Sequence, residues 1–236
     1  MGETGWTRLL GSDFNSQITW LALATLVGLI VALCVAGWKN RQDIRRAVAI
    51  IFGGWLIVTW LVFSFMSGIF HAYYTVALSP AIAILAAIAE TLLWSRRKTS
   101  WAPFVGGFTT LTTSLWAYSL VSTASGYRAL AIVITIMGAI ATIIMVGFGI
   151  QHMVSVPRET SMSKFLAYLA VLLAATAMIS GPVAWTAATV ATGHQGSIVS
   201  AGPNSSSQPG GMGGAGVSPG LEGNGKATSN SVFPNA

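Results

Sequence analysis

The sequence has few charged side chains. They make up 8% of its 236 residues, whereas a typical soluble domain carries about 25%. A shortage of this size argues against a soluble globular protein. The chain has one cysteine, Cys34, which excludes an intrachain disulfide and leaves the thiol without a partner for a metal site. Its three histidines, His71, His152 and His194, are scattered and lack metal-ligand spacing, so no metal site is predicted.

Patterns that carry catalysis are equally scarce. No glycine-rich loop followed by Lys and Ser or Thr opens a helix, which excludes a phosphate-cradling loop of that kind. The six acidic residues include no pair whose spacing suits acid–base catalysis. The sequence by itself therefore leaves the catalytic residues unknown.

Long apolar runs are what the chain has in abundance. A helix needs roughly 20 apolar residues to cross the hydrocarbon core of a membrane. Six windows meet this need, at about 17–37, 47–66, 75–94, 101–121, 129–150 and 165–185. Because backbone amides in lipid must be paired within their own segment, each window is predicted to be a helix. The expected fold class is an all-α polytopic membrane protein with about six transmembrane helices and a disordered Gly/Ser-rich C-terminal tail.

Basic residues alternate between the predicted loops. The net charge is +6, and nine of the twelve basic residues lie in three alternate loops: Lys39, Arg41, Arg45, Arg46, Arg96, Arg97, Lys98, Arg158 and Lys164. The positive-inside rule makes these loops cytoplasmic. The prediction is a multi-pass protein of the plasma membrane with both termini outside. Membrane lipids are the expected partners, and nucleic acid is not.

The chain divides by composition into three parts. Residues 1–16 are a short polar segment predicted to face outward, and residues 17–185 form the transmembrane domain. Residues 186–236 are rich in Gly, Ser, Asn and Pro, cannot bury enough surface to offset chain entropy, and are predicted to be a disordered outward tail.

Two spans contain polar or helix-breaking residues. Span 101–121 carries Thr and Ser between Thr109 and Ser114, which places it toward the bundle interior, where hydroxyls bond across helices. Pro80 falls near the first turn of its span, where its missing N–H matters least. Glu90, an acid within the same span, is expected to pair with Arg96 or Arg97 at the interface, and a proton or ion role is the alternative.

The stretch "FHAYY", residues 70–74, is the candidate site. It places His71, Tyr73 and Tyr74 at the outer interface, in a loop without charge. One interpretation is an aromatic belt at headgroup level, which residue types alone favour. The other is a polar pocket that binds a lipid phosphate, with Arg128 as the basic residue in the outward loops between spans.

A resemblance to a known family covers about residues 5–220. "LVFSFMSGIFHAYYTVALSPAIAIL", "GWTRLLGSDFNSQITWLALATLVGLI" and "TAATVATGHQGSIVSAGP" resemble segments of bacterial GT-C-type membrane glycosyltransferases. These are related to the protein O-mannosyltransferases and the aminoarabinose transferases. The resemblance implies a sugar donor linked to polyprenyl phosphate, used on the outer face of the membrane. It also implies that the aromatic loop, with His71, Tyr73 and Tyr74, lines the donor headgroup site, to which the charge distribution adds Arg128 as the outward cation.

The sequence also departs from the family pattern. The family's catalytic acidic loop has no equivalent here, Ser67 lies where some relatives place a Lys, and the outward domain after the Gly-rich linker is missing. The expectation is a C-terminal membrane half, catalytically incomplete without an N-terminal half that carries the acidic loop. No cofactor is evident in the chain, although the resemblance leaves room for a divalent metal in the complete enzyme. The rival interpretation is a small six-span transporter or structural membrane subunit.

Overall fold

The computed structural model describes residues 4–36, 42–68, 70–154, 160–191 and 200–203. Within these residues the secondary structure is helical and contains no strand, which confirms the predicted all-α class. The α-helices are α1 (Asn15–Ile18), α2 (Ala22–Ala36), α3 (Ile44–Phe65), α4 (Ser79–Ser95), α5 (Trp101–Val121), α6 (Arg128–Val154) and α7 (Ser161–Ala191). Short 3-10 helices are η1 (Arg8–Leu10), η2 (Thr19–Leu21) and η3 (Ala72–Leu78).

Five helical segments of the described chain are long and apolar enough to cross a membrane. They are Asn15–Ala36, Ile44–Phe65, Ala72–Ser95, Arg128–Val154 and Ser161–Ala191. The chain is therefore a membrane protein, as predicted. The remaining predicted span, residues 101–121, does form a helix with these bounds, α5, but its run of hydroxyl side chains makes it less apolar than the other five.

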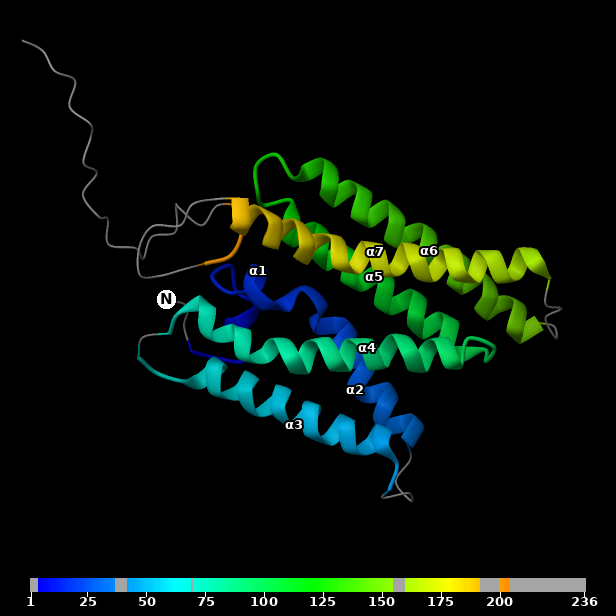
Figure 1. Cartoon of the computed structure of the whole chain (residues 1–236), viewed down its shortest axis with the longest axis horizontal. Coiled ribbons are helices and arrows are strands. Elements are labelled where there is room, and N and C mark those ends of the chain that lie inside the picture. Colours follow the sequence, from blue (N-terminus) through cyan, green and yellow to red (C-terminus); the bar gives the residue numbers. More distant parts are fainter. Residues whose placement is uncertain (1–3, 37–41, 69, 155–159, 192–199, 204–236) are drawn as a thin grey trace, which may run out of the picture.

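The long helices form two groups that lie side by side. In Figure 1, α2, α3 and α4 make up one half of the bundle, and α5, α6 and α7 make up the other. Within the halves, α2 packs closely on α4, and α6 packs on both α5 and α7. The halves meet where α2 and α4 contact α5. Helix α5 thus has neighbours in both halves, which places it in the interior of the bundle.

The interior position of α5 explains its composition. Thr109, Thr110, Thr113 and Ser114 are all buried, as the sequence predicted for this span. The Thr109 hydroxyl donates a hydrogen bond to the carbonyl of Val105 in the same helix. The buried hydroxyls of Thr113 and Ser114 have no hydrogen-bond partner among the described residues, so small size rather than bonding across helices suits them to this tightly packed position.

Glycines let helix backbones approach closely in both halves. A Cβ atom on Gly28 of α2 would overlap the carbonyl of Leu85 in α4. A Cβ atom on Gly138 of α6 would overlap the Ser114 side chain of α5. Between α5 and α6, the Thr142 hydroxyl also donates to the Gly107 carbonyl at 3.1 Å. Such small-residue contacts are the usual way for membrane helices to associate without a hydrophobic driving force.

The first predicted span is not one continuous helix. α1 passes through η2 before α2 begins, and the sequence there contains the polar residues Asn15, Ser16, Gln17 and Thr19. The indole Nε1 of Trp116 donates to both the carbonyl and the hydroxyl oxygen of Thr19, each at 3.1 Å. A side chain from the other half thus bonds to the backbone at this irregular turn, which explains why the break is tolerated at membrane depth.

Pro80 lies in the first turn of α4, as predicted, directly after η3. The preceding 3-10 helix is held against α3, because Trp55 Nε1 donates to the Ala77 carbonyl at 3.0 Å. The proline therefore marks the point where a tight 3-10 segment becomes a regular α-helix.

Part of the predicted tail belongs to the folded structure. Helix α7 continues to Ala191, through residues 186–191. Beyond it, Ala201 exchanges two hydrogen bonds with the Gln17 side chain, at 2.8 and 3.0 Å. Gly202, whose φ is +113°, donates to the Thr189 hydroxyl at 2.8 Å. Residues 192–199 and 204–236 of the predicted tail lie outside the described residues.

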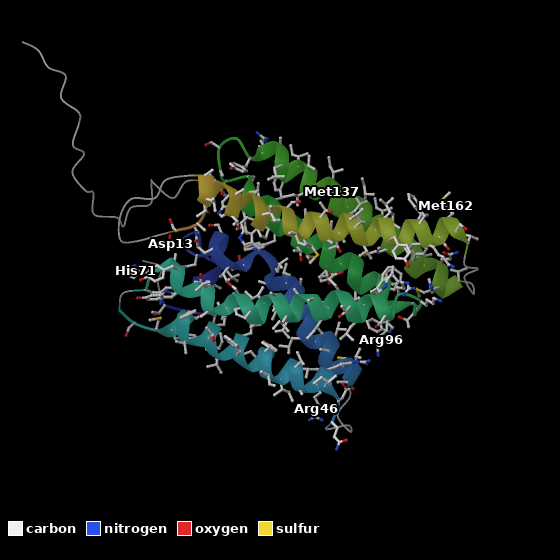
Figure 2. All side chains as sticks on the ribbon, viewed as in Figure 1. Asp13, Arg46, His71, Arg96, Met137 and Met162 are labelled. Carbon is white, nitrogen blue, oxygen red and sulfur yellow. The ribbon has the colours of Figure 1, made fainter. Side chains whose placement is uncertain are left out.

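The two ends of the bundle differ in chemistry. Figure 2 shows Asp13 and His71 at one end, and Arg46 and Arg96 at the other. We call the first the aromatic end, for His71, Tyr73 and Tyr74, and the second the basic end, for Arg45, Arg46, Arg96, Arg97, Lys98 and Lys164. Among the described residues, the basic residues of the alternate loops thus gather at one end, as their spacing predicted. Lys39, Arg41 and Arg158 lie outside the described residues.

Candidate functional site

The site predicted from "FHAYY" lies in the connection between α3 and α4. Helix α3 ends at Phe65, and Gly68 turns the chain with a φ of +94°, a conformation that side chains with a Cβ rarely adopt. His71 then precedes η3 in extended backbone conformation. The turn and the 3-10 helix together bring the side chains of this short segment onto one surface.

The structure brings His71, Tyr73 and Tyr74 into mutual contact. The His71 ring stacks on Tyr73 with centroids 5.5 Å apart and planes 7° apart. Tyr74 meets both edge-on, at 4.6 Å from Tyr73 and 5.7 Å from His71. Tyr73 is 46% exposed and Tyr74 is 37% exposed, so the cluster forms an accessible surface. It combines an imidazole with two phenols, which are hydrogen-bond donors suited to an anionic group.

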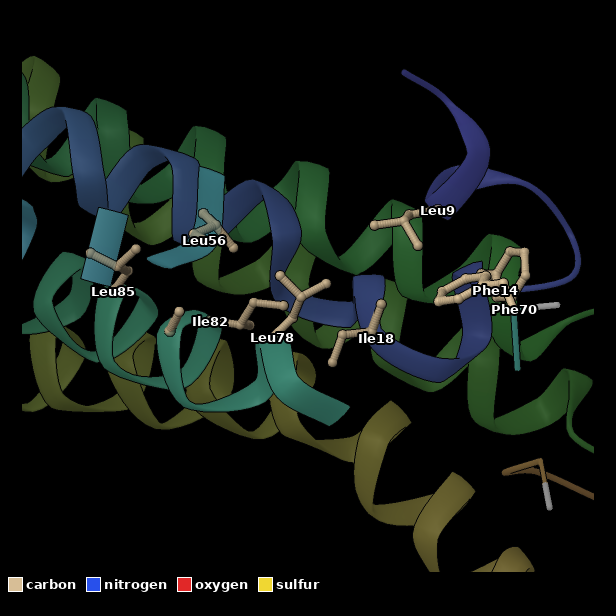
Figure 3. Packing of buried hydrophobic residues seen from close by; sticks show 9 residues of the cluster. Leu9, Phe14, Ile18, Leu56, Phe70, Leu78, Ile82 and Leu85 are labelled. Carbon is tan, nitrogen blue, oxygen red and sulfur yellow. The ribbon is translucent and has the colours of Figure 1, made fainter. Parts of the chain in front are cut away.

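A second layer of aromatic rings supports this cluster from below. Phe70 is buried and its ring lies 6.0 Å from Tyr74, 5.2 Å from Phe63 and 4.7 Å from Phe14. Figure 3 shows Phe14 and Phe70 together at one edge of the core formed with Leu78 and Ile82. This packing fixes the loop to α1 and α3, so the exposed rings rest on a rigid base.

Arg8 lies beneath the cluster. Among the described residues, it is the basic residue that contacts Phe70, the ring on which Tyr74 packs. It is only 6% exposed, and its guanidinium lies 4.8 Å from the centre of the Phe70 ring. Its Nη1 donates to the carbonyls of Met66 at 2.8 Å and Phe63 at 3.3 Å. These are carbonyls at the C-terminal end of α3, where a positive charge is favourable. The buried Nε of Arg8 has no hydrogen-bond partner among the described residues.

Arg8 is the residue that the sequence reasoning missed. It is one of the three basic residues outside the alternate loops, and the sequence does not assign it to the site. Its only sequence signal is its position in a short, otherwise weakly charged segment before the first span. Its partners are the carbonyls and rings of a distant segment, and these contacts require the tertiary fold.

Arg128 is placed apart from the three rings. It begins α6, is exposed, and belongs to the half of the bundle formed by α5, α6 and α7. No contact within the described residues joins it to His71, Tyr73 or Tyr74. The structure therefore groups the rings with Arg8 and leaves Arg128 at the start of a neighbouring helix.

The aromatic end does not supply a set of metal ligands. In the described ranges, no three His, Cys, Asp or Glu side chains converge. These residues by themselves do not fit the divalent metal that the resemblance leaves open. Asp13 is the acid that Figure 2 shows at the same end as His71, and it is half-buried beside Phe14.

Comparison with known proteins gives one relationship. The chain is 32% identical over 89 residues to a Bacillus subtilis (strain 168) protein named "Putative mannosyltransferase YycA". The match covers 37% of this chain and 13% of that protein, so the chain spans a small part of the relative's length. No family model matches the chain. No solved structure matches it either. The match supports a glycosyltransferase-like relationship.

Proposed function

We propose that this chain is a membrane glycosyltransferase whose aromatic end binds a sugar donor linked to polyprenyl phosphate. The observation that carries the proposal is the joint placement of His71, Tyr73 and Tyr74 over the buried guanidinium of Arg8. The partial match to a mannosyltransferase supplies the reaction class. Helices long and apolar enough to span a membrane support the idea that the cluster lies where a lipid could present its phosphate.

Each part of the cluster has a role in this proposal. The phenols of Tyr73 and Tyr74 and the His71 ring donate hydrogen bonds to phosphate oxygens. Arg8 contributes positive potential from below, because a buried charge is screened much less than an exposed one. When the sugar is transferred, the lipid phosphate leaves with added negative charge, and fixed donors at that position stabilise the transition state. Arg128, exposed at the start of α6, is proposed to add a second cation.

The side of the membrane follows from charge in this proposal. The basic end faces the cytoplasm by the positive-inside rule, so the aromatic end faces outward. The donor then binds in the outer leaflet of the plasma membrane. An acceptor hydroxyl approaching from outside would meet the phosphate at the exposed faces of Tyr73 and Tyr74.

The aromatic-belt interpretation makes a different prediction from the phosphate site. A belt depends on rings at headgroup level, so removing one phenolic oxygen should matter little. A phosphate site depends on donors, and a charge-assisted hydrogen bond contributes about 1.5–3 kcal/mol. Losing one such bond corresponds to a roughly ten-fold or larger rise in Kd.

The deciding experiment measures binding of a short-chain polyprenyl phosphate to the purified chain in detergent micelles. The variants are Tyr74→Phe, His71→Ala and Arg128→Gln, and Tyr118→Phe is the matched control because Tyr118 lies on α5, outside the ring cluster and outside the lining of the cavity at the basic end. We expect Tyr74→Phe and His71→Ala to weaken binding about ten-fold, Arg128→Gln to weaken it less because Arg128 contacts none of the three rings within the described residues, and the control to bind like wild type. Wild-type affinity in all three site variants, with helical content unchanged, would leave the loop as a membrane belt and remove the proposed site.

A further inference from the structure

A cavity of about 700 Å³ opens at the basic end, between α4, α5, α6 and α7. Its apolar wall comes from all four helices and includes Leu93, Ala102, Pro103, Met145, Phe148 and Val171. A volume of this size is in the range of sites that hold drug-sized ligands. It lies at the opposite end of the bundle from the aromatic cluster, so an inference about it does not rest on the function proposed above.

The charges that line the cavity are mostly positive. Arg97, Lys98 and Lys164 lie at its wall, and Glu90 is the acid among its described lining residues. Arg97 and Lys98 follow the end of α4, whereas Glu90 lies within that helix. Glu90 lies five residues before Ser95, the last residue of α4, which corresponds to roughly 7–8 Å along the axis, so the cations belong to the rim and Glu90 to a deeper level. The predicted ion pair of Glu90 with Arg96 or Arg97 does not form.

Arg97 is held in position at this rim. Its guanidinium lies 4.2 Å from the centre of the Trp94 ring, and its Nη1 donates to the Trp94 carbonyl at 3.1 Å. Trp94 in turn contacts Tyr168 of α7 at 5.3 Å. A guanidinium carries five N–H donors in a fixed plane, and this arrangement uses one of them for the backbone. An oriented guanidinium is well suited to bidentate binding of a phosphate group.

We propose that this cavity binds the phosphate headgroup of an anionic phospholipid from the leaflet at the basic end. Arg97 and Lys98 at the rim would contact the phosphate, with Lys164 across from them on α7. The apolar wall below the rim would receive the upper part of an acyl chain. The oriented guanidinium of Arg97 at the rim favours a headgroup with net negative charge over a zwitterionic one.

The lining distinguishes a lipid from free phosphate. Inorganic phosphate would need the rim cations but not an apolar wall built from four helices. Trp94 and Tyr168, which border the rim, are residue types that prefer the headgroup level of a membrane. The cations therefore lie at the depth where lipid phosphates occur, next to a wall that matches hydrocarbon.

The test uses the full chain, purified in micelles of a zwitterionic detergent. Binding of phosphatidylglycerol is measured by native mass spectrometry, next to phosphatidylcholine with the same acyl chains and inorganic phosphate as separate arms. The key pair of variants is Arg97→Gln and Arg96→Gln, because these neighbours carry the same charge and only Arg97 lines the cavity. Ala167→Phe adds bulk to the wall without changing charge.

We expect wild type to bind phosphatidylglycerol at least ten-fold more tightly than phosphatidylcholine. Arg97→Gln and Ala167→Phe should each lose most of this preference, and Arg96→Gln should keep it. Equal losses for Arg96→Gln and Arg97→Gln would overturn the proposal, because they would show attraction to surface charge rather than a site. Inorganic phosphate that competes fully with the lipid at similar concentration would overturn the lipid assignment. An unchanged preference in Arg97→Gln would overturn it as well.

Discussion

Arg8 and Phe70 form a cation–π contact of 4.8 Å that ties the segment before the first span to the loop between α3 and α4. The same guanidinium donates to the Met66 carbonyl. One buried cation therefore holds three features together: the end of α3, the aromatic layer beneath the candidate site, and the N-terminal segment. Four predictions follow from this contact, from two close helix approaches and from the distribution of charge.

Arg8→Ala should lower the free energy of unfolding by about 2–4 kcal/mol, because it removes charge-assisted hydrogen bonds to two carbonyls and a desolvated cation–π contact. Thermal unfolding in detergent, followed by helical circular dichroism, measures the change. Arg45→Ala is the control, since Arg45 is exposed at the basic end. Equal stability of the two variants would show that the Arg8 contacts contribute nothing.

Gly28→Ala should destabilise the bundle by about 1–3 kcal/mol, because its methyl group would overlap the Leu85 carbonyl and force α2 away from α4. Gly54→Ala in α3 is a matched control, because a Cβ there meets no atom within 4 Å. Alanine is the better helix former, so the control should be neutral or slightly stabilising. Unfolding midpoints of the two variants decide the matter, and a Gly28→Ala variant as stable as the control would contradict the close approach.

Gly138→Ala should be destabilising by a similar amount, and Ser114→Gly should rescue it. The Ser114 side chain occupies the space that a Cβ on Gly138 would need, whereas the next backbone atom is 3.8 Å away. A double-mutant cycle on unfolding free energies should give a favourable coupling of about 1 kcal/mol or more. Gly147→Ala on the same helix is the control with open space. Additive effects of the two substitutions would mean that the residues do not compete for this space.

The orientation in the membrane can be tested with single cysteines in a Cys34→Ser background, since Cys34 is the only native cysteine. Ser125 and Ser100 are both exposed and lie in the loops at the two ends of α5. A membrane-impermeant maleimide applied to intact cells should label Ser125→Cys at the aromatic end. It should leave Ser100→Cys unlabelled until the membrane is opened. The reverse pattern would place the aromatic end in the cytoplasm.

The sequence predicts the fold well where local patterns determine it. Apolar runs define the helices because each spanning segment must satisfy its own backbone in lipid. The run of Thr and Ser side chains from Thr109 to Ser114 correctly predicts that α5 is an interior helix. Pro80 correctly predicts the start of α4, because the first turn is where proline costs least, although Pro182 shows that a proline also occurs inside α7.

Contacts between segments that are distant in the sequence could not be predicted from these local patterns. The break at η2 is stabilised by a hydrogen bond from Trp116, in the other half of the bundle, to the Thr19 carbonyl. Burial of Arg8 depends on carbonyls of α3, and the cavity at the basic end depends on four helices meeting there. For the site, the ring cluster could be foreseen because its three residues are neighbours in the chain, but the cation beneath them could not.

The contacts between the two halves of the bundle differ between the aromatic end and the basic end. At the aromatic end, Trp116 bonds to Thr19, Gln17 bonds to Ala201, and the rings of Trp20 and Trp185 lie 5.2 Å apart. At the basic end, the cavity separates α4 from α6, and the Trp94–Tyr168 ring contact bridges α4 and α7. Within each half, one helix pair packs closely at a glycine, α2 on α4 at Gly28 and α6 on α5 at Gly138. The halves also meet near the basic end, where Leu92 and Leu93 of α4 pack with Ala102 of α5, so separating them there would expose this buried cluster beside the cavity.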